Sequence, residues 1–264
     1  MLIIKDIYNL NTYLKAFKDK GYSIGYVPTM GALHEGHGSL IEKSQNDNQK
    51  TIISIFINEK QFDDTQDFEA YPRNKGDDYN FCEKHNVDII FEPSAEEIYP
   101  KEYKSVQNSH FQNILCDEYR PGHFNGVVTV LSRLFSIIES DKVYFGEKDF
   151  QQLKIVENLI KDNFPNLKLV AIPTVRSNEG IALSSRNKKL SKKQKSDFIS
   201  FQKEVIQFIS HLDKKIDLIE ANKKAEEFIK SYKKFDYFEF RNSSNLNLEG
   251  SLGEARLFYA IYKS

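Results

Sequence analysis

The chain has 264 residues, which is enough for one large domain or for a main domain with a smaller one. Its 37 Lys and Arg residues almost balance 38 Asp and Glu residues, so the formal net charge is -1 and we expect no nucleic-acid partner. Hydrophobic residues make up 40% of the chain, with 20 Phe among the aromatic ones, as in an ordinary globular protein.

Cysteine usage and the N-terminus indicate a cytoplasmic protein. Cys82 and Cys116 lie far apart in the sequence and outside any metal-binding spacing, which is typical of reduced thiols. The first residues lack the basic and apolar regions of a signal peptide. No apolar run approaches the roughly 20 residues of a membrane span, so we also expect no membrane partner.

The first two-thirds of the chain alternates helical and strand-like patterns. Apolar residues recur three or four positions apart in residues 6–20, which predicts a helix that ends at Gly21. Residues 51–57 are rich in β-branched side chains and predict a strand. In chain order we predict helices at 6–20, 37–46, 77–85, 127–139 and 150–162, and strands at 23–28, 51–57, 88–91, 142–146 and 167–172.

Strands that alternate with helices predict an α/β fold, here a Rossmann-like parallel sheet over residues 1–175. Ligands of such sheets bind outside the carboxyl ends of the strands. The last third of the chain has a different pattern, so we place a boundary near Val175 and expect a smaller α+β domain over residues 176–264. The predicted elements of this second domain are helices at 191–211 and 218–232 and strands at 237–240 and 256–260.

A Lys-rich run over residues 188–195 has two interpretations. It could form a patch that binds RNA, or the solvated face of a helix with interspersed acidic residues. Mixed charge runs usually form solvated faces, so we favour the second interpretation.

His34 and His37 follow a predicted strand and a glycine, near the start of the next predicted helix. Residues three apart lie on one face of a helix, and the free N–H groups at a helix N-terminus favour anions. Two imidazoles there can donate hydrogen bonds to phosphate oxygens. The alternatives are two unrelated histidines or a zinc pair, which would need a third ligand where only Glu35 is nearby. We predict that residues 29–37 bind the phosphates of ATP.

Polar side chains also follow the second predicted strand. Asn58 and Gln61 can hydrogen-bond a hydroxyl or a carboxylate, although Asn is also common in turns. Further along, Asp77 and Asp78 could cap the next helix or approach Mg2+ through water, and we favour capping on the residues alone.

Two later segments carry side chains suited to a nucleotide. Lys148 follows the fourth predicted strand, where it could bind a phosphate as a point charge, and Asp149 could hydrogen-bond a ribose. Ser184, Ser185 and Arg186 offer two hydroxyls and a guanidinium to a triphosphate. A polar interdomain loop could have the same composition.

Seven motifs, in order from about residue 1 to 190, together resemble the pantothenate synthetase (pantoate–β-alanine ligase) family. The single His-x-Gly-His motif is a moderate signal for nucleotidylyl-transferring enzymes, whereas seven motifs in order are highly specific. The motifs are residues 28–37 (PTMGALHEGH), 54–58 (SIFIN), 61–62 (QF), 71–73 (YPR), 120–124 (RPGHF), 145–152 (FGEKDFQQ) and 183–187 (LSSRN).

The resemblance implies an enzyme that condenses pantoate with β-alanine in two steps. The pantoate carboxylate would attack the α-phosphorus of ATP and release pyrophosphate, and the β-alanine amine would then attack the pantoyl adenylate and expel AMP. Orientation and charge stabilisation could carry most of this catalysis. The triphosphate implies Mg2+, and the family implies a homodimer.

The resemblance also assigns residues to each part of the reaction. His34 and His37 would stabilise the adenylation transition state, Lys148 would bind the departing pyrophosphate, and Asp77 would be a metal ligand. Arg186 would hold the β- and γ-phosphates. The remaining residues divide between the nucleotide (Met30, Gly146, Asp149, Val175, Leu183, Ser184 and Ser185) and the two small substrates (Asn58, Gln61, Tyr71 and Gln152).

The chain departs from the family pattern in three places. Glu59 and Lys60 stand where members usually have Pro-Met, next to the expected acid pocket. Gly38 replaces a usual Met behind the helix, and Phe81 replaces a Gln that can support magnesium. We therefore expect changes in the pocket wall and in helix packing, but not in the phosphate contacts.

Two rival functions compete with the ligase. A nucleotidylyltransferase would use the same His-x-Gly-His motif to join AMP to a phosphate-bearing acceptor. A nucleotide-sensing module would bind ATP without releasing pyrophosphate. Gln61 and Gln152, without a basic cluster for an acceptor phosphate, favour a small hydroxy acid as the substrate.

Overall fold

The computed structural model describes residues 1–232 and 235–261 and divides the chain into two compact units. The first unit comprises Met1–His110 and Gly122–Lys189, and the second comprises Phe111–Pro121 and the chain from Leu190. The side chains of residues 188, 189 and 261 are not described.

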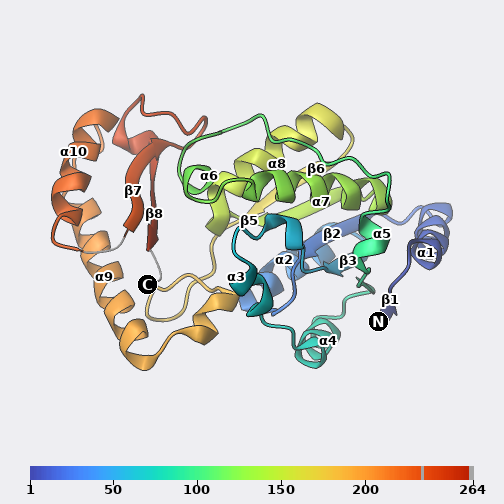
Figure 1. The fold of residues 1–264 in the computed structure, drawn as a ribbon. Coiled ribbons are helices and arrows are strands. Elements are labelled where there is room, and N and C mark those ends of the chain that lie inside the picture. The colour runs from blue at the N-terminus through green and yellow to red at the C-terminus, as the bar shows by residue number, and fades with distance from the viewer. Residues whose placement is uncertain (233–234, 262–264) are drawn as a thin grey trace. The chain divides into compact units, whose positions relative to one another are not determined.

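The first unit is built on a six-stranded parallel sheet (Figure 1). Its strands lie in the order β1 (Leu2–Ile4), β4 (Ile89–Phe91), β3 (Lys50–Ile55), β2 (Ile24–Thr29), β5 (Lys142–Gly146) and β6 (Lys168–Ile172). The central strands are nearly continuous buried runs, as expected for strands covered on both faces. The order reverses at β2, which pairs with β3 on one side and β5 on the other.

Helices cover both faces of this sheet. One face carries α1 (Ile7–Asp19), α7 (His123–Ile138) and α8 (Phe150–Asn163), and the other carries α2 (Glu35–Asp47) and α4 (Lys75–Lys84) (Figure 1). Ile41 of α2 and Cys82 of α4 pack in one buried cluster with side chains of β2, β3 and β4. The shorter elements are helices α3 (Thr65–Glu69) and α5 (Ala95–Ile98) and the 3-10 turns η1 (Glu59–Gln61), η2 (Glu147–Asp149) and η3 (Ser185–Lys189).

The predicted α/β class is confirmed, and each predicted element of the first unit lies within a few residues of its expected bounds. The sequence does not predict β1, because three residues are too few for a pattern and only their pairing with β4, Leu2 opposite Ile89, makes them a strand. α7 begins at His123 rather than at residue 127. Gly122, in the left-handed conformation with φ 84°, ends the turn immediately before it.

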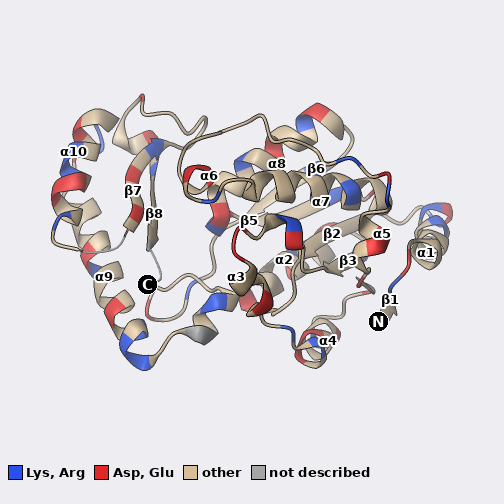
Figure 2. Cartoon of the chain, viewed as in Figure 1, with Lys and Arg blue, Asp and Glu red and all other residues tan. Residues whose placement is uncertain are grey.

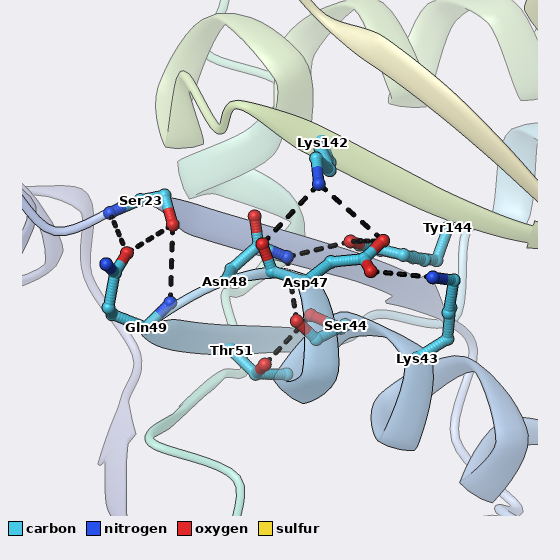
Figure 3. A network of polar contacts seen from close by, with 9 residues as sticks. All are labelled: Ser23, Lys43, Ser44, Asp47, Asn48, Gln49, Thr51, Lys142 and Tyr144. Carbon is cyan, nitrogen blue, oxygen red and sulfur yellow. Dashed lines mark hydrogen bonds and ion pairs between the residues drawn. The ribbon is translucent and has the colours of Figure 1, made fainter.

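A polar network fixes the C-terminal end of α2 against the sheet (Figure 3). The Asp47 carboxylate accepts hydrogen bonds from Lys43 Nζ at 2.6 Å and from the Tyr144 hydroxyl at 3.1 Å. Asn48 Nδ2 donates to the same hydroxyl at 2.7 Å, and Lys142 Nζ lies 3.6 Å from Asp47 Oδ2. Because Tyr144 and Lys142 belong to β5, the network positions α2, whose opposite end carries the predicted histidines.

The second unit has the predicted α+β composition, with a two-stranded antiparallel sheet. Phe201, Phe238 and Phe240 belong to its core, where aromatic rings pack against one another. Its elements are α6 (Cys116–Tyr119), α9 (Lys192–Ser210), α10 (Leu218–Ile229), β7 (Phe235–Asn242) and β8 (Ala255–Ile261), with the 3-10 turn η4 (Leu252–Glu254).

Lys and Arg are mixed with Asp and Glu along α9 and α10 (Figure 2). This mixture fits the solvated-face interpretation of the Lys-rich run, but the side chains of Lys188 and Lys189 lie outside those described. The choice between the two interpretations therefore stays a prediction. In the described part of the chain, no helix combines the length and the apolar composition that crossing a membrane requires.

The compact units divide the chain later than the predicted boundary at Val175, because residues 176–189 pack with the first unit. A short antiparallel bridge closes this segment, and the Ser185 hydroxyl donates to the Ala32 carbonyl oxygen at 3.0 Å. Residues 111–121 join the second unit, an arrangement that no single boundary in the sequence describes.

Candidate active site

A pocket of about 250 Å³ opens at the carboxyl ends of β2, β3, β5 and β6, within the first unit. This is the edge at which the strand order reverses, where ligands of open α/β sheets bind. The pocket brings together every predicted site residue except Asp77: Met30, His34, His37, Asn58, Gln61, Tyr71, Gly146, Lys148, Asp149, Gln152, Val175, Leu183, Ser184, Ser185 and Arg186.

The two histidines form the N-terminal cap of α2. His34 has extended backbone angles (φ -153°, ψ 173°), and its Nδ1 accepts a hydrogen bond from the Gly36 N–H at 3.1 Å. His37 Nδ1 accepts from the His34 N–H at 3.2 Å. Because both Nδ1 atoms accept, each neutral imidazole carries its proton on Nε2 and can donate it to a phosphate oxygen. A Cβ at Gly36 would lie 2.8 Å from His34 Cε1, so this packing requires glycine.

His37 is neutral at physiological pH. Burial lowers its pKa to about 3, with further lowering from its neighbours His34 and Lys148. The imidazoles of His34 and His37 lie 4.2 Å apart between ring centroids. His37 therefore offers a neutral N–H donor, and the positive charge that attracts an anion comes from lysine and arginine.

We expect the low pKa of His37 to make the protein less stable in acid. Between pH 6.5 and about 3, the unfolded chain binds a proton at this residue that the folded chain does not, so the free energy of unfolding falls as pH falls. Urea unfolding should be measured near pH ~7 and near pH ~5. Between these two values, the free energy of unfolding should decrease less for His37→Gln than for the unaltered chain. Equal losses, or an NMR titration of the His37 ring with a midpoint near 6.5, would contradict the lowered pKa.

Asp78 holds the backbone that precedes His34. Its carboxylate is 4% exposed and accepts hydrogen bonds from the Ala32 N–H at 2.9 Å and the Leu33 N–H at 2.7 Å. Gly31 and Ala32 both have left-handed backbone angles, φ 78° and 51°, which costs energy at Ala32. The carboxylate thus stabilises a strained turn that places the first histidine. The sequence predicts only capping or a metal contact for Asp78, because its partners are 45 or more positions away.

The helix that carries this aspartate, α4, is itself anchored. The Asn74 side chain caps its N-terminus. The buried Glu92 carboxylate, just after β4, accepts hydrogen bonds from Lys75 Nζ and the Tyr79 hydroxyl. The hydrogen bond to Glu92 raises the pKa of Tyr79 to about 12. These contacts attach α4 to the sheet and so fix the position of the Asp78 carboxylate beside the turn at Gly31 and Ala32.

Asp77 lies outside the pocket lining, in the first turn of α4. Asn74 Nδ2 donates to its carboxylate at 2.6 Å. Over residues 1–232 and 235–261, no group of three or more His, Cys, Asp and Glu side chains is arranged to hold a metal ion. Asp77 as a magnesium ligand therefore stays a prediction.

The cationic side chains of the pocket are paired with carboxylates. Lys148 Nζ lies 3.0 Å from Asp149 Oδ1, in η2 directly after β5. Desolvation raises the pKa of Asp149, but the charge and hydrogen bond of Lys148, with the charges of Arg186 and His123, together lower it more, so the net pKa lies below the usual value and the carboxyl is ionised. Arg186 Nη2 lies 2.7 Å from Asp67 Oδ2. Partly exposed ion pairs contribute little stability, so an anionic ligand can compete for both cations.

The segment between Val175 and Arg186 attaches to the sheet near β6. The Leu183 N–H donates to the Val175 carbonyl oxygen at 3.0 Å. Tyr71, 6% exposed, hydrogen-bonds Ser185; burial raises the pKa of this tyrosine although the hydrogen bond lowers it. The predicted serines and arginine are thus held at the pocket by contacts within the first unit.

Amide side chains line the pocket after β3 and at the start of α8. Asn58 is 1% exposed, and its Nδ2 donates to Gln61 Oε1 at 3.0 Å. Gln61 Nε2 donates to Met30 Sδ at 3.1 Å. Gln152 lies in the first turn of α8 and lines the same pocket. These side chains offer hydrogen-bond donors and acceptors to a polar ligand.

An apolar wall completes the pocket, and the sequence does not predict it. Four side chains of α7 and the ring of Phe56 form this wall. Because α7 is buried over most of its length, its apolar pattern cannot distinguish core residues from pocket residues. The α7 members are Val127, Val130, Leu131 and Leu134.

A parallel sheet with a pocket at its strand-order reversal, lined by a histidine pair at a helix N-terminus and by lysine and arginine, defines an α/β protein that binds phosphorylated ligands. Comparison with known proteins identifies one family within this class. Residues 2–264 match the sequence model of pantoate-beta-alanine ligase. The chain belongs to this family and is a ligase.

Two relatives illustrate the similarity. Over 205 residues, the chain is 46% identical to the pantothenate synthetase of Sulfurihydrogenibium sp. (strain YO3AOP1), covering 77% of this chain and 73% of the relative. Over 267 aligned positions it is 39% identical to the pantothenate synthetase of Caldicellulosiruptor bescii, covering 99% and 95%.

Solved structures have the same fold. A pantothenate synthetase from Thermus thermophilus superposes with a TM-score of 0.86 at 31% identity, covering 95% of this chain and 91% of that one. A pantoate-beta-alanine ligase from Francisella tularensis, complexed with beta-gamma ATP and beta-alanine, superposes with a TM-score of 0.80 at 32% identity, covering 99% and 97%. The predicted family and fold are thereby confirmed.

The unusual residues noted in the sequence are accommodated by local packing. A Cβ at Gly38 would lie 2.9 Å from His85 Cε1, so this imidazole occupies the space behind α2. Phe81 packs against the same imidazole at 4.3 Å between ring centroids. Lys60 places its ammonium 4.7 Å from the ring centroid of Tyr99.

Proposed function

We propose that this chain condenses pantoate with β-alanine, using ATP and releasing AMP and pyrophosphate, through a pantoyl adenylate. The observation that carries the proposal is a single pocket that combines donors for phosphate, amides for hydroxyls and carboxylate, and an apolar wall. Such a pocket can hold a triphosphate beside a small, partly apolar hydroxy acid. The similarity to a ligase complexed with beta-gamma ATP and beta-alanine supports this assignment.

In the first step, a carboxylate oxygen of pantoate bonds to the α-phosphorus of ATP while the bond to the pyrophosphate oxygen breaks. A free carboxylate is a poor acylating agent because its leaving group would be oxide, whereas the adenylate can release AMP. Negative charge builds on the phosphoryl oxygens during the attack. The Nε2–H groups of His34 and His37 are suited to stabilise this charge, because capping has already fixed both rings.

In the second step, the β-alanine amine bonds to the acyl carbon and loses a proton, while the bond between that carbon and the AMP oxygen breaks. Both steps join two bound reactants, so orientation within one pocket can supply much of the rate acceleration. No covalent bond to the enzyme is required.

We assign the nucleotide to the residues after β2, β5 and β6. Lys148 would bind phosphate as pyrophosphate leaves, and Arg186 would hold the β- and γ-phosphates. The fixed N–H donors and the two cations together would make the triphosphate end of the pocket. The other nucleotide contacts would come from Met30, Gly146, Asp149, Val175, Leu183, Ser184 and Ser185.

We assign pantoate to the amide side chains and the apolar wall. Gln61 and Gln152 would hold its hydroxyls and carboxylate, with Asn58 and Tyr71 beside the acid and amine. The apolar side chains of α7 suit the two methyl groups of pantoate. A nucleotide has no such branched aliphatic group. This wall favours a small branched acid over a phosphate-bearing acceptor.

Mg2+ fits this pocket as the companion of the triphosphate. The ion keeps several waters and is usually bound by substrate phosphates with one or two carboxylates. The ionised Asp149 carboxylate lines the pocket beside Lys148, and Asp77 stays the predicted ligand through water. When bound, Mg2+ would neutralise phosphate charge.

We further propose that the chain acts as a homodimer in the cytoplasm. The dimer follows from the family resemblance alone, and light scattering of the purified protein would test it. Cys82 is a free, buried thiol, which is compatible with a reducing compartment.

Product analysis separates the ligase from its rivals. With ATP, pantoate and β-alanine, we expect one AMP and one pantothenate for each pyrophosphate released. Omission of β-alanine should stop pantothenate formation but still allow pyrophosphate release in the first turnover. AMP transfer that ignores β-alanine would indicate a nucleotidylyltransferase, and ATP binding without pyrophosphate release would indicate a sensing module.

A further inference from the structure

A chain of side-chain hydrogen bonds leads from Tyr99 to the pocket. The Tyr99 hydroxyl donates to Asn58 Oδ1 at 2.7 Å. Asn58 Nδ2 donates to Gln61 Oε1 at 3.0 Å and to the Gly126 carbonyl oxygen at 3.1 Å. Gln61 Nε2 is directed at Met30 Sδ, 3.1 Å away, and both residues line the pocket.

The directions of these hydrogen bonds follow from chemistry. The Gly126 carbonyl oxygen can only accept, so the Asn58 amide nitrogen must face it, and the Asn58 oxygen is left facing the Tyr99 hydroxyl, which donates to it. Asn58 then presents its nitrogen, which only an acceptor can face, so the oxygen of the Gln61 amide must point toward Asn58. The amino group of Gln61 is left on the pocket side.

We infer that Tyr99 is a positioning residue whose hydroxyl, together with the Gly126 carbonyl oxygen, holds the Asn58 amide so that the Gln61 amino group faces the substrate and selects an acid that presents a hydrogen-bond acceptor at that point. The inference rests on the proposed contact between Gln61 and pantoate. Pantoate offers carboxylate and hydroxyl oxygens as acceptors there. An amide turned the other way would present its oxygen and repel a carboxylate.

The surroundings of Tyr99 support a fixed donor. Its ring packs against Phe56, a residue of the pocket wall, with ring centroids 6.1 Å apart. The Lys60 ammonium lies over the same ring and also donates to Ser105 Oγ at 3.4 Å. Burial raises the pKa of the Tyr99 hydroxyl above its usual value, so it keeps its proton at every working pH. The Glu59–Lys60 departure therefore adds a contact that holds this ring.

Tyr103 provides a matched control. Its hydroxyl also donates to a buried acceptor, the Thr129 carbonyl oxygen at 3.3 Å, and a cation, Arg133, also lies over its ring. The Tyr99 and Tyr103 rings are neighbours, with centroids 6.0 Å apart. The hydroxyl of Tyr103 is directed at Thr129 rather than at Asn58 and Gln61. Tyr103→Phe therefore removes a similar hydroxyl without changing the hydrogen bonds that lead from Tyr99 through Asn58 to Gln61.

The test is steady-state kinetics of Tyr99→Phe and Tyr103→Phe, with AMP release as the readout. We expect Tyr99→Phe to raise KM for pantoate about tenfold while KM for ATP stays within about twofold, because the buried Asn58 oxygen loses its donor and only the amide pair that contacts the acid is held less firmly. Tyr103→Phe should leave both KM values within about twofold of the unaltered chain. An unchanged pantoate KM in Tyr99→Phe, or equal increases in both variants, would overturn the inference.

A second variant guards against loss of folding in the first. Asn58→Asp keeps an acceptor for the Tyr99 hydroxyl but removes the donor to Gln61, so the Gln61 amino group should turn away from the substrate. We expect at least the same tenfold rise in pantoate KM. If the unaltered chain makes no AMP from pantoate, the proposed function fails. If it makes AMP and both variants have the same pantoate KM as the unaltered chain, only the positioning role of Tyr99 fails.

Discussion

Replacement of His34 by alanine should lower the rate of pantoate-dependent pyrophosphate release by about 10²-fold or more, as for loss of a preorganised transition-state donor. The imidazole caps α2 and presents Nε2–H to the pocket, so alanine removes both the cap and the donor. The rate should be measured in a single turnover with enzyme in excess, which separates adenylation from later steps. An unchanged single-turnover rate would refute this role for His34.

A second variant separates capping from catalysis. Asparagine is a strong N-cap residue but lacks a ring donor, so His34→Asn should keep the melting temperature near that of the unaltered chain while losing a comparable part of the rate. His110→Ala is the control. This histidine pairs with Asp162 at 3.0 Å, outside the pocket lining, and its loss should leave the rate within about twofold.

The second large effect is expected at Asp78. Asp78→Asn keeps the size of the side chain but replaces one acceptor oxygen with an NH2 group that faces a backbone N–H. We expect a loss of about 2 kcal/mol in the free energy of unfolding, because a buried donor is left without its acceptor. We also expect a fall of about tenfold or more in the adenylation rate, because the turn before His34 is no longer held.

Asp77→Asn is the matched control for stability. Asp77 neighbours Asp78 but lies in the exposed first turn of α4, where the loss of a charge at a helix N-terminus costs less than about 1 kcal/mol. Urea unfolding of the two variants should therefore separate them clearly. Equal stabilities, or Asp78→Asn with a normal adenylation rate, would show that the turn needs no carboxylate.

Much of the first unit could be predicted because its strands carry their own pattern. β2, β3 and β5 are short buried runs between helical segments, and their order along the chain already indicates a parallel sheet. β1 could not be predicted, since its three residues become a strand only by pairing with β4. The place of residues 111–121 in the second unit depends on tertiary packing in the same way.

Some residues of the candidate site could likewise be predicted from the local sequence, and others could not. The predicted side chains in the pocket stand directly after strands or at helix starts, so their residue types and positions carry the information. Asp78 and Tyr99 act through hydrogen bonds to partners more than forty positions away, and no local pattern marks such a pair. The sequence did not predict the apolar wall formed by α7, because a buried helix has the same apolar sequence pattern whether its side chains face the core or a ligand.

The most direct test of the adenylate pathway follows one oxygen atom. Pantoate labelled with ¹⁸O in its carboxylate is incubated with the chain, ATP and β-alanine, and the AMP is analysed by mass spectrometry. Attack of the carboxylate on the α-phosphorus predicts one labelled oxygen in AMP and none in pyrophosphate. Unlabelled AMP would contradict the proposed adenylate, because the acid would then have been activated without bonding to the α-phosphorus.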